Sequence, residues 1–304
     1  MKRFLSSLGL VLLSLGATAP SAEAEQLGYG RLLVNDFFGD GHDRWRTGSI
    51  VGSHVFGPSW SGALPESFGE VIELRILGQI IAPENLAMPS PVDRSYAGAI
   101  SVGAHTHFQQ RGLEFALGAD VTFTGPQTGL GDFQSWLHGQ FDFVGPSSTV
   151  LNSQIGNAVH LDAVAEVGHS YQLGQMATAR PFLEARAGTE TLVRAGVDVT
   201  FGTMTNGSLL VRDPVSGQRY RAIEGGETGV SFVVGADIAY VDSSVFIPGN
   251  SAAVMEDSRH RLRAGLLWQG ESHSIYYGAS YLSPEFTSQD EGQIVGALRV
   301  KIDF

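Results

Sequence analysis

The sequence has 304 residues, 31 of them acidic and 19 basic, and its net charge of -12 excludes a nucleic-acid-binding surface made of clustered basic residues. It contains no cysteine, which excludes disulfides, thiol catalysis and a lipid-anchoring cysteine. The 39 glycines and the low charged fraction of 16% favour a strand-rich fold over a helical one.

The N-terminal segment has the three parts of a secretory signal peptide. Met1-Lys2-Arg3 is basic, Phe4 to Leu15 is apolar, and Ala22-Glu23-Ala24 is a small-x-small cleavage site. We therefore predict a signal peptide over residues 1–24 and a single domain over residues 25–304. No later stretch approaches the roughly eighteen uninterrupted apolar residues of a spanning helix, so a membrane-spanning form of this chain would have to use strands.

Alternation of apolar and polar residues recurs along the whole chain, as in Leu113–Phe123 and Val193–Phe201, and every polar face carries charges. We predict twelve strands: Leu27–Phe37, Arg46–Phe56, Glu70–Ile81, Tyr96–His107, Leu113–Phe123, Ala158–Ser170, Arg180–Glu190, Leu192–Phe201, Gly229–Tyr240, Arg259–Trp268, His273–Tyr281 and Gln293–Phe304.

Alternation alone fits both a soluble β-sandwich and an outer-membrane barrel, because only the assignment of the two faces differs. Three features favour a closed antiparallel transmembrane barrel. The segments are about ten residues long, which suits a tilted spanning strand. Their polar faces mix arginine with acidic residues, as a packed barrel interior requires. The last strand ends on the aromatic Phe304, and an even strand number is the rule for such barrels.

One segment departs from the strand pattern. Between Leu130 and Phe143 the large apolar residues recur at helical spacing, which predicts a short helix in an extracellular loop between two strands. Gln134 and His138 are four residues apart on one face of it, and Phe133, Trp136 and Leu137 can pack the helix down. His138 could serve as a general base or could be an ordinary solvated histidine.

The segment from Asn35 to Gly48 is unusual for a hairpin. Asp40-Gly41-His42-Asp43 is ordinary turn chemistry, but the Asn35-Asp36 pair occupies a strand end, where these residues are disfavoured. With Thr47 across the hairpin, their oxygens could bind a hard cation such as calcium.

A third polar group begins at Asp93-Arg94 and continues into a strand that carries His105 and His107 on one face. We interpret it as an ion pair and an interior histidine pair rather than a reactive site. The remaining histidines have no zinc-ligand spacing, and the chain lacks a nucleophile-elbow serine motif and a phosphate loop.

Five short motifs in one order resemble the outer-membrane lipid A 3-O-deacylase family. They are Asn35-Asp36, Asp43-Arg44-Trp45-Arg46-Thr47-Gly48, Asp93-Arg94-Ser95-Tyr96-Ala97-Gly98, Gly125-Pro126 with Gln134-Ser135-Trp136-Leu137-His138, and Gln154-Ile155. The resemblance covers nearly all of residues 25–304 and is strongest up to about Asn157. It implies a twelve-stranded barrel whose site lies between the wall and a loop helix.

The resemblance also implies a calcium-assisted ester hydrolysis in which a histidine activates water. Catalytic roles carry over to Asn35, Thr47, Gln134 and His138, and a metal-ligand role carries over to Asp36. The implied cofactor is calcium, the implied partners are lipid A or lipopolysaccharide and the outer-membrane bilayer, and no oligomer is implied.

Two positions depart from the family pattern. Pro91-Val92 stands where some members have a lysine, and Val144 stands where an acidic residue is expected. Asp142 becomes the alternative metal ligand if the loop is displaced. Other interpretations remain open, namely an outer-membrane phospholipase or a non-enzymatic barrel that is structural, a small channel or an inactive relative.

Overall fold

The structure is a computed structural model that describes residues 24–302. The signal-peptide prediction, apart from Ala24, and the terminal aromatic Phe304 lie outside the described residues.

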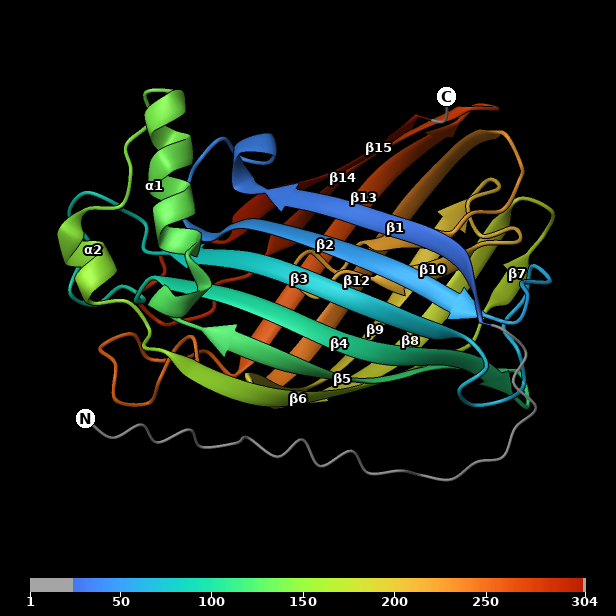
Figure 1. Ribbon diagram of the computed structural model, residues 1–304, viewed down its shortest axis with the longest axis horizontal. Helices are drawn as coiled ribbons and strands as arrows, with labels where there is room; N and C mark the ends of the chain where they lie inside the picture. Colours follow the sequence, from blue (N-terminus) through green and yellow to red (C-terminus); the bar gives the residue numbers. More distant parts are fainter. Residues whose placement is uncertain (1–23, 303–304) are drawn as a thin grey trace, which may run out of the picture.

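All twelve predicted strands are present and form the wall of a closed antiparallel barrel (Figure 1). The wall strands are β1 (Glu25–Asn35), β2 (Trp45–Gly57), β3 (Ile72–Ala82), β4 (Ala97–Gln110), β5 (Leu113–Thr124), β6 (Ala158–Gly168), β8 (Ala177–Ala187), β9 (Glu190–Phe201), β12 (Gly229–Ser244), β13 (Ser258–Gln269), β14 (His273–Leu282) and β15 (Gln293–Ile302). Sequence neighbours pair around the barrel, and β1 pairs with β15 to close it. The short β7 (Tyr171–Leu173) continues the pairing of β6 along β8.

In the wall strands, the side chains on one face are buried in the lumen and those on the other face are exposed, as in a membrane barrel. In β13, Arg261 and Arg263 are 5% and 4% exposed, whereas the outward Leu262 and Leu266 are 58% and 51% exposed. Charged residues therefore face the lumen and apolar residues face outward, which decides between the two alternatives that the alternation left open.

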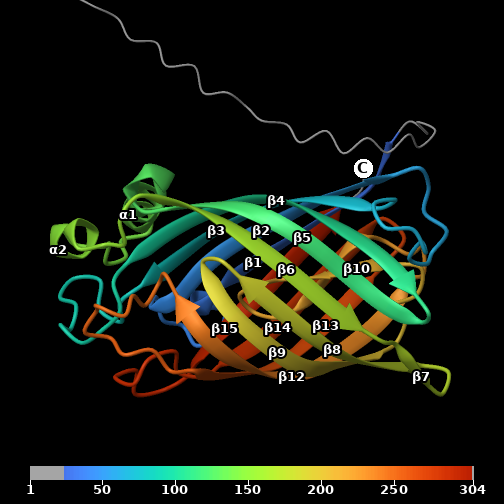
Figure 2. The ribbon, with the colours of Figure 1, turned by 90° about the horizontal axis from the view of Figure 1, so that it is seen from below.

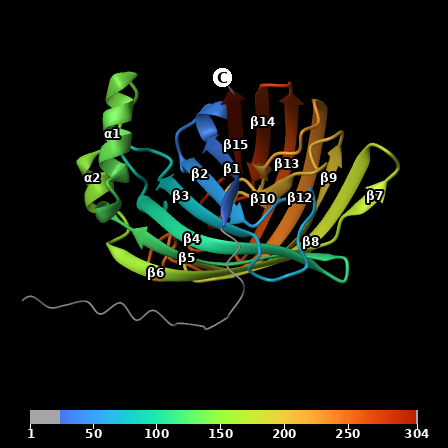
Figure 3. The ribbon, with the colours of Figure 1, turned by 45° about the vertical axis from the view of Figure 1, so that its right-hand side comes forward.

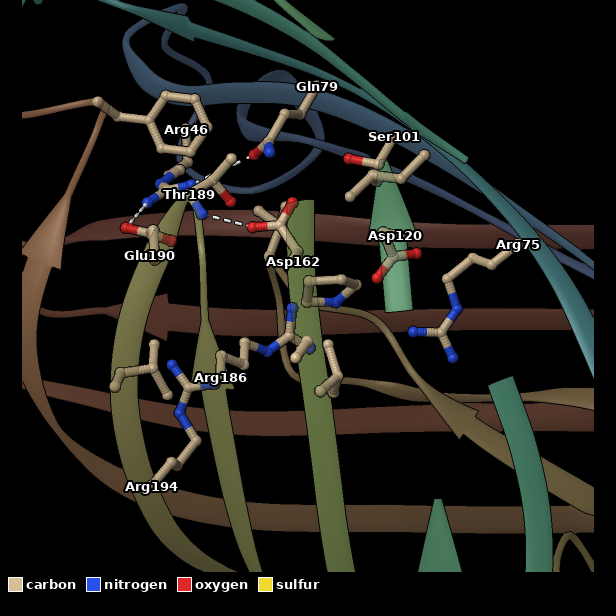
Figure 4. Close-up of a pocket in the computed structure, with 17 residues that line it drawn as sticks. Arg46, Arg75, Gln79, Ser101, Asp120, Asp162, Arg186, Thr189, Glu190 and Arg194 are labelled. Atoms are coloured by element: carbon tan, nitrogen blue, oxygen red, sulfur yellow. Dashed lines mark hydrogen bonds and ion pairs between the residues drawn. The ribbon is translucent and has the colours of Figure 1, made fainter. Parts of the chain in front are cut away.

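The lumen is filled by paired charges. Arg263 contacts both Asp198 and Asp237, and Arg261 Nε lies 3.0 Å from Asp237. Nearer the rim, Arg46 donates to Gln79 at 3.2 Å and to Glu190 at 3.0 Å, as Figure 4 shows. These buried arginines thus have opposite charges beside them, which an interior of this kind needs.

An inner hairpin, β10 (Leu209–Arg212) and β11 (Arg219–Ile223), lies inside the barrel and was not predicted. The Gln218 amide donates to the Ala264 and Ala279 carbonyl oxygens of the wall at 3.1 Å each. On the opposite side, the Tyr220 hydroxyl lies 2.7 Å from the Ser53 hydroxyl. An apolar core forms where the hairpin packs on β1 and β2, so the hairpin fills much of the lumen.

The connections at one end carry the helical segments, as Figures 1 and 2 show. These are η1 (Asp36–Phe38), η2 (Pro126–Thr128), α1 (Leu130–Gln140) and α2 (Ser148–Asn152). The α1 helix confirms the predicted loop helix but ends three residues earlier, because Asp142 turns the chain with a left-handed φ of 58°. Among residues 24–302, no helix is long and apolar enough to cross a membrane.

Candidate active site

The first half of the site lies where β1 ends and β2 begins. The Asn35 side chain caps η1 by accepting a hydrogen bond from the Phe37 backbone N–H at 2.8 Å, which ends β1 two residues before the predicted position. This turn places Asp36 in a fully buried position. Asp36 accepts hydrogen bonds from the Arg44 backbone N–H at 2.7 Å and from the Thr47 hydroxyl at 3.0 Å.

Burial dominates the electrostatics of Asp36. The pKa of its carboxyl is raised to about 8, chiefly by loss of solvent. The negative charges of Asp43 and Asp40 contribute to the rise, and the hydrogen bonds from Arg44 and Thr47 oppose it. Among residues 24–302, no cationic side chain forms an ion pair with Asp36 that would compensate its burial. It is therefore a strong candidate ligand for a bound cation.

The second half of the site is α1, which stands at the rim beside the end of β3 and the start of β4 (Figure 1). Gln134 and His138 are 3% and 7% exposed and face the wall. The sequence-based expectation that Phe133 and Trp136 pack the helix down is wrong, since they are 49% and 59% exposed. The helix docks through its polar face because Asp43 supplies acceptors there.

Asp43 joins the two halves. Its Oδ1 accepts hydrogen bonds from the Gln134 amide at 3.1 Å and from the Thr47 hydroxyl. Its Oδ2 lies 3.0 Å from His138 Nε2. Sequence reasoning assigned Asp43 to a turn and missed this role, because nothing local shows that a residue 91 positions away will face it.

The orientation of His138 is fixed by a backbone group. His138 Nδ1 lies 2.8 Å from the Val144 carbonyl oxygen. A carbonyl oxygen only accepts, so Nδ1 carries the hydrogen and Nε2 is the atom directed at Asp43. Position 144, where an acidic side chain was expected, therefore contributes its main chain instead.

The structure brings Asn35, Asp36, Thr47, Gln134 and His138 together at one place on the rim. It does not bring Asp142 there. This residue is exposed in the turn after α1, and its carboxylate has no hydrogen bond or ion pair with any residue in the described part of the chain.

The oxygen atoms at this place suit a hard cation. Within residues 24–302, no three His, Asp or Glu residues are grouped so that they could hold a metal ion. Asp36 and Asp43 nevertheless provide two carboxylates beside the Thr47 hydroxyl, and Gln134 Oε1 is buried without a hydrogen-bond partner. Carboxylate, amide and hydroxyl oxygens are the ligands that calcium prefers, so the residues fit the ion.

The other predicted polar group belongs to the interior. Arg94 is buried and lies 2.5 Å from Glu285. His105 lies 3.0 Å from Asp120, and His107 lies 2.7 Å from Glu73. These contacts confirm the interpretation as an ion pair and an interior histidine pair.

Exposed aromatic side chains surround the site on its outer side. Phe37 and Phe143 are 57% and 52% exposed, with ring centroids 5.8 Å apart, and Phe143 lies 6.1 Å from the His138 ring. The site therefore opens between the polar rim and an apolar outer surface, where an amphipathic molecule fits.

Comparisons with known proteins agree with this architecture. The family model described as "Outer membrane protein LpxR" matches residues 6–304. A search of curated proteins finds no match. The solved structure of LpxR from Salmonella typhimurium superposes with a TM-score of 0.76 at 17% identity, covering 91% of this chain and 100% of that chain. An outer membrane channel from Pseudomonas putida F1 reaches a TM-score of 0.44 at 11% identity, covering 95% and 100%.

Proposed function

Because this chain belongs to the outer membrane protein LpxR family, we propose that it hydrolyses an acyl ester of lipid A, with His138 as the general base and calcium as the cofactor. The protein resides in the outer membrane, where lipid A is available to a site on the barrel rim. The observation that carries the proposal is the meeting of Asp36, Asp43, Gln134 and His138 beneath exposed aromatic side chains.

The reaction begins with a water molecule beside His138. With its Nδ1 hydrogen held by the Val144 carbonyl, Nε2 is left to take a proton from water as that water attacks the ester carbon. The ester C–O bond then breaks, and the proton on Nε2 passes to the departing alkoxide oxygen, so the products are a fatty acid and an alcohol. The 36% exposed side chain of Asp43 has solvent on one side, from which the water can approach Nε2. Hydrolysis by this route requires no covalent nucleophile.

The surrounding residues position these groups. Gln134 fixes α1 through Asp43, Thr47 holds the two carboxylates on either side of its hydroxyl, and Asn35 sets the turn that buries Asp36. Calcium, when bound by the rim oxygens, would polarise the ester carbonyl and stabilise the developing negative charge. The exposed Phe37 and Phe143 offer a surface for acyl chains.

Neither alternative function has comparable support. A serine-dependent phospholipase needs a serine beside the histidine, and in the described part of the chain the hydrogen-bonding neighbours of His138 are Val144 and Asp43. A small channel needs an open lumen, which the inner hairpin occupies.

The test is the mass of lipid A from outer membranes that contain the protein. We expect loss of one acyl chain in calcium and little change with a chelator. His138→Ala should reduce the rate by roughly 100-fold or more, the usual effect of removing a general base. His42→Ala, which changes a 53% exposed histidine at the same rim, is the matched control. Unchanged lipid A with folded, calcium-supplied protein would refute the proposal.

A further inference from the structure

The first and last strands of the barrel wall, β1 and β15, pair along only part of their length. β1 and β15 pair at only three described positions, Leu33 to Asn35 with Gly296 to Leu298, whereas β1 and β2 pair along nearly their whole length. In Figure 1 the two ribbons diverge from there toward the end that lies opposite α1. Below the paired positions, the facing strand edges bound a crevice of about 400 Å³.

The inner hairpin closes this crevice from behind. The β1 backbone lies so close to β11 that a Cβ on Gly28 would come within 2.3 Å of the Ala222 carbonyl oxygen, and one on Gly30 within 2.4 Å of the Arg221 carbonyl oxygen. In Figure 3 the hairpin strand β10 lies inside the ring of wall strands. The crevice is therefore a blind recess in the wall, open to the outside of the barrel. We call it the seam crevice, and its lining residues are Leu27, Gly28, Tyr29, Arg31, Ala222, Glu224, Arg299, Val300, Lys301 and Ile302.

The seam crevice carries a net positive charge. Three of its lining residues are cationic, namely Arg31, Arg299 and Lys301, and Glu224 is the one carboxylate among its described lining residues. Glu224 contacts both Arg299 and Lys301. Arg299 is 5% exposed, and its Nε has no hydrogen-bond partner in the described residues. Among the described lining residues, the cationic side chains therefore outnumber the carboxylates.

Arg31 faces outward, which is unusual for a charged residue in the wall of a membrane barrel. Its guanidinium reaches across the seam and donates to the Val300 carbonyl oxygen at 3.1 Å. A guanidinium has five N–H donors, and this contact uses one. Since polar groups inside a bilayer need partners, the remaining donors call for an acceptor from outside the chain.

The position of the seam crevice indicates which molecule can supply that acceptor. At the α1 end one connection spans residues 125–157, whereas at the opposite end the β4–β5 turn comprises only residues 111–112. In barrels of this kind the short turns face the periplasm and the longer loops face the exterior. The crevice therefore opens in the periplasmic half of the wall, and outside it the apolar Tyr29 and Ile302 are 43% and 49% exposed.

We propose that the seam crevice binds the headgroup of an anionic glycerophospholipid from the periplasmic leaflet. Arg31, Arg299 and Lys301 would donate to the phosphate, and the acyl chains would lie along the outer surface beside Tyr29 and Ile302. Phosphate suits this site because charge-assisted hydrogen bonds from guanidinium groups bind it strongly. The site is separate from the rim and does not depend on hydrolytic activity.

The test is native mass spectrometry of the full barrel released from nanodiscs that contain phosphatidylglycerol or phosphatidylcholine. We expect one phosphatidylglycerol retained per barrel and no retained phosphatidylcholine. Arg31→Gln should weaken retention roughly tenfold, the effect expected for one hydrogen bond to a charged group. Arg111→Gln is the matched control because it removes an exposed cation from the turn at the same end, away from the seam, and it should retain the lipid.

Lys301→Gln provides a second test, because Lys301 lies in the same crevice on β15. This substitution should also weaken retention of the lipid. Equal retention of the lipid by Arg31→Gln and Arg111→Gln would overturn the proposal. So would equal retention of the anionic and neutral lipids. Complete displacement of the lipid by millimolar inorganic phosphate would likewise overturn it, because the acyl chains would then contribute nothing.

Discussion

Replacing Asp43 with alanine should loosen α1 from the barrel rim. The change leaves the Gln134 amide, which is 3% exposed, without its hydrogen-bond acceptor. An unsatisfied buried polar group costs about 1–3 kcal/mol. The contact with His138 adds less than about 1 kcal/mol, because the Asp43 side chain is 36% exposed and screened by solvent.

Together these terms amount to about 2 kcal/mol, which is roughly a 30-fold increase in the population of undocked helix. Hydrogen exchange of residues 130–140, followed by mass spectrometry on the intact barrel in detergent, measures this population directly. Asp43→Asn is the matched variant. It keeps an oxygen acceptor for Gln134 and should therefore lose less than about tenfold in protection.

Protection that changes by less than threefold in Asp43→Ala would refute the reasoning, and so would identical losses in the two variants. The first result would mean that other contacts hold the helix. The second would mean that the charge of Asp43, rather than its acceptor oxygens, holds α1 in place. Neither measurement requires lipid A or calcium, so the helix contact is tested apart from catalysis.

Three further predictions concern single side chains. In calcium-free buffer, the free energy of unfolding should fall as the pH rises from about 4 to 8, because folding raises the pKa of Asp36 to about 8 and the folded chain binds a proton that the unfolded chain has lost. Thermal unfolding of Asp36→Asn should lack this contribution. A wild-type stability that rises with pH in step with the variant would contradict the prediction. Glu285→Gln should destabilise the rim by about 3–5 kcal/mol, because Arg94 would lose its buried counter-charge and Arg46 and Arg259 would share the one remaining carboxylate, Glu190. Chemical denaturation checks this, and a change below about 1 kcal/mol would show that the arginines find other partners. Val144→Ala should leave lipid A hydrolysis within twofold, because only the main chain at this position contacts His138; a large loss in the same mass assay would assign a role to the exposed side chain.

The wall of the barrel could be predicted from the sequence because its signal is local. In β13 Arg261 and Arg263 alternate with Leu262 and Ala264, and such a two-residue period, repeated in twelve segments, predicts the number of strands. The burial of the arginines in the structure then assigns the charged face to the lumen. The inner hairpin escaped prediction because β10 and β11 are only four and five residues long. Segments that short cannot be separated from loop by periodicity alone.

The candidate site, like the fold, could be predicted only in part. Gln134 and His138 could be placed on one face because four residues make one helical turn. The contact between Asp43 and α1 depends on how a loop returns to the rim, and nothing in either segment specifies this. Backbone groups pose a further limit, because the carbonyl of Val144 is chemically the same as every other carbonyl until the fold places it beside a histidine.

The inner hairpin constrains the order in which the barrel can assemble. It is inserted between β9 and β12, yet it contacts Gly28 and Gly30 on β1, at the other end of the chain. These contacts can form only after β1 has been brought beside the hairpin from about two hundred positions away along the chain. The pairing of β1 with β15 joins residues that are still further apart in the sequence. We therefore expect the packing of β1 on the hairpin and its pairing with β15 to be slow steps of folding, because contacts of long range form slowly.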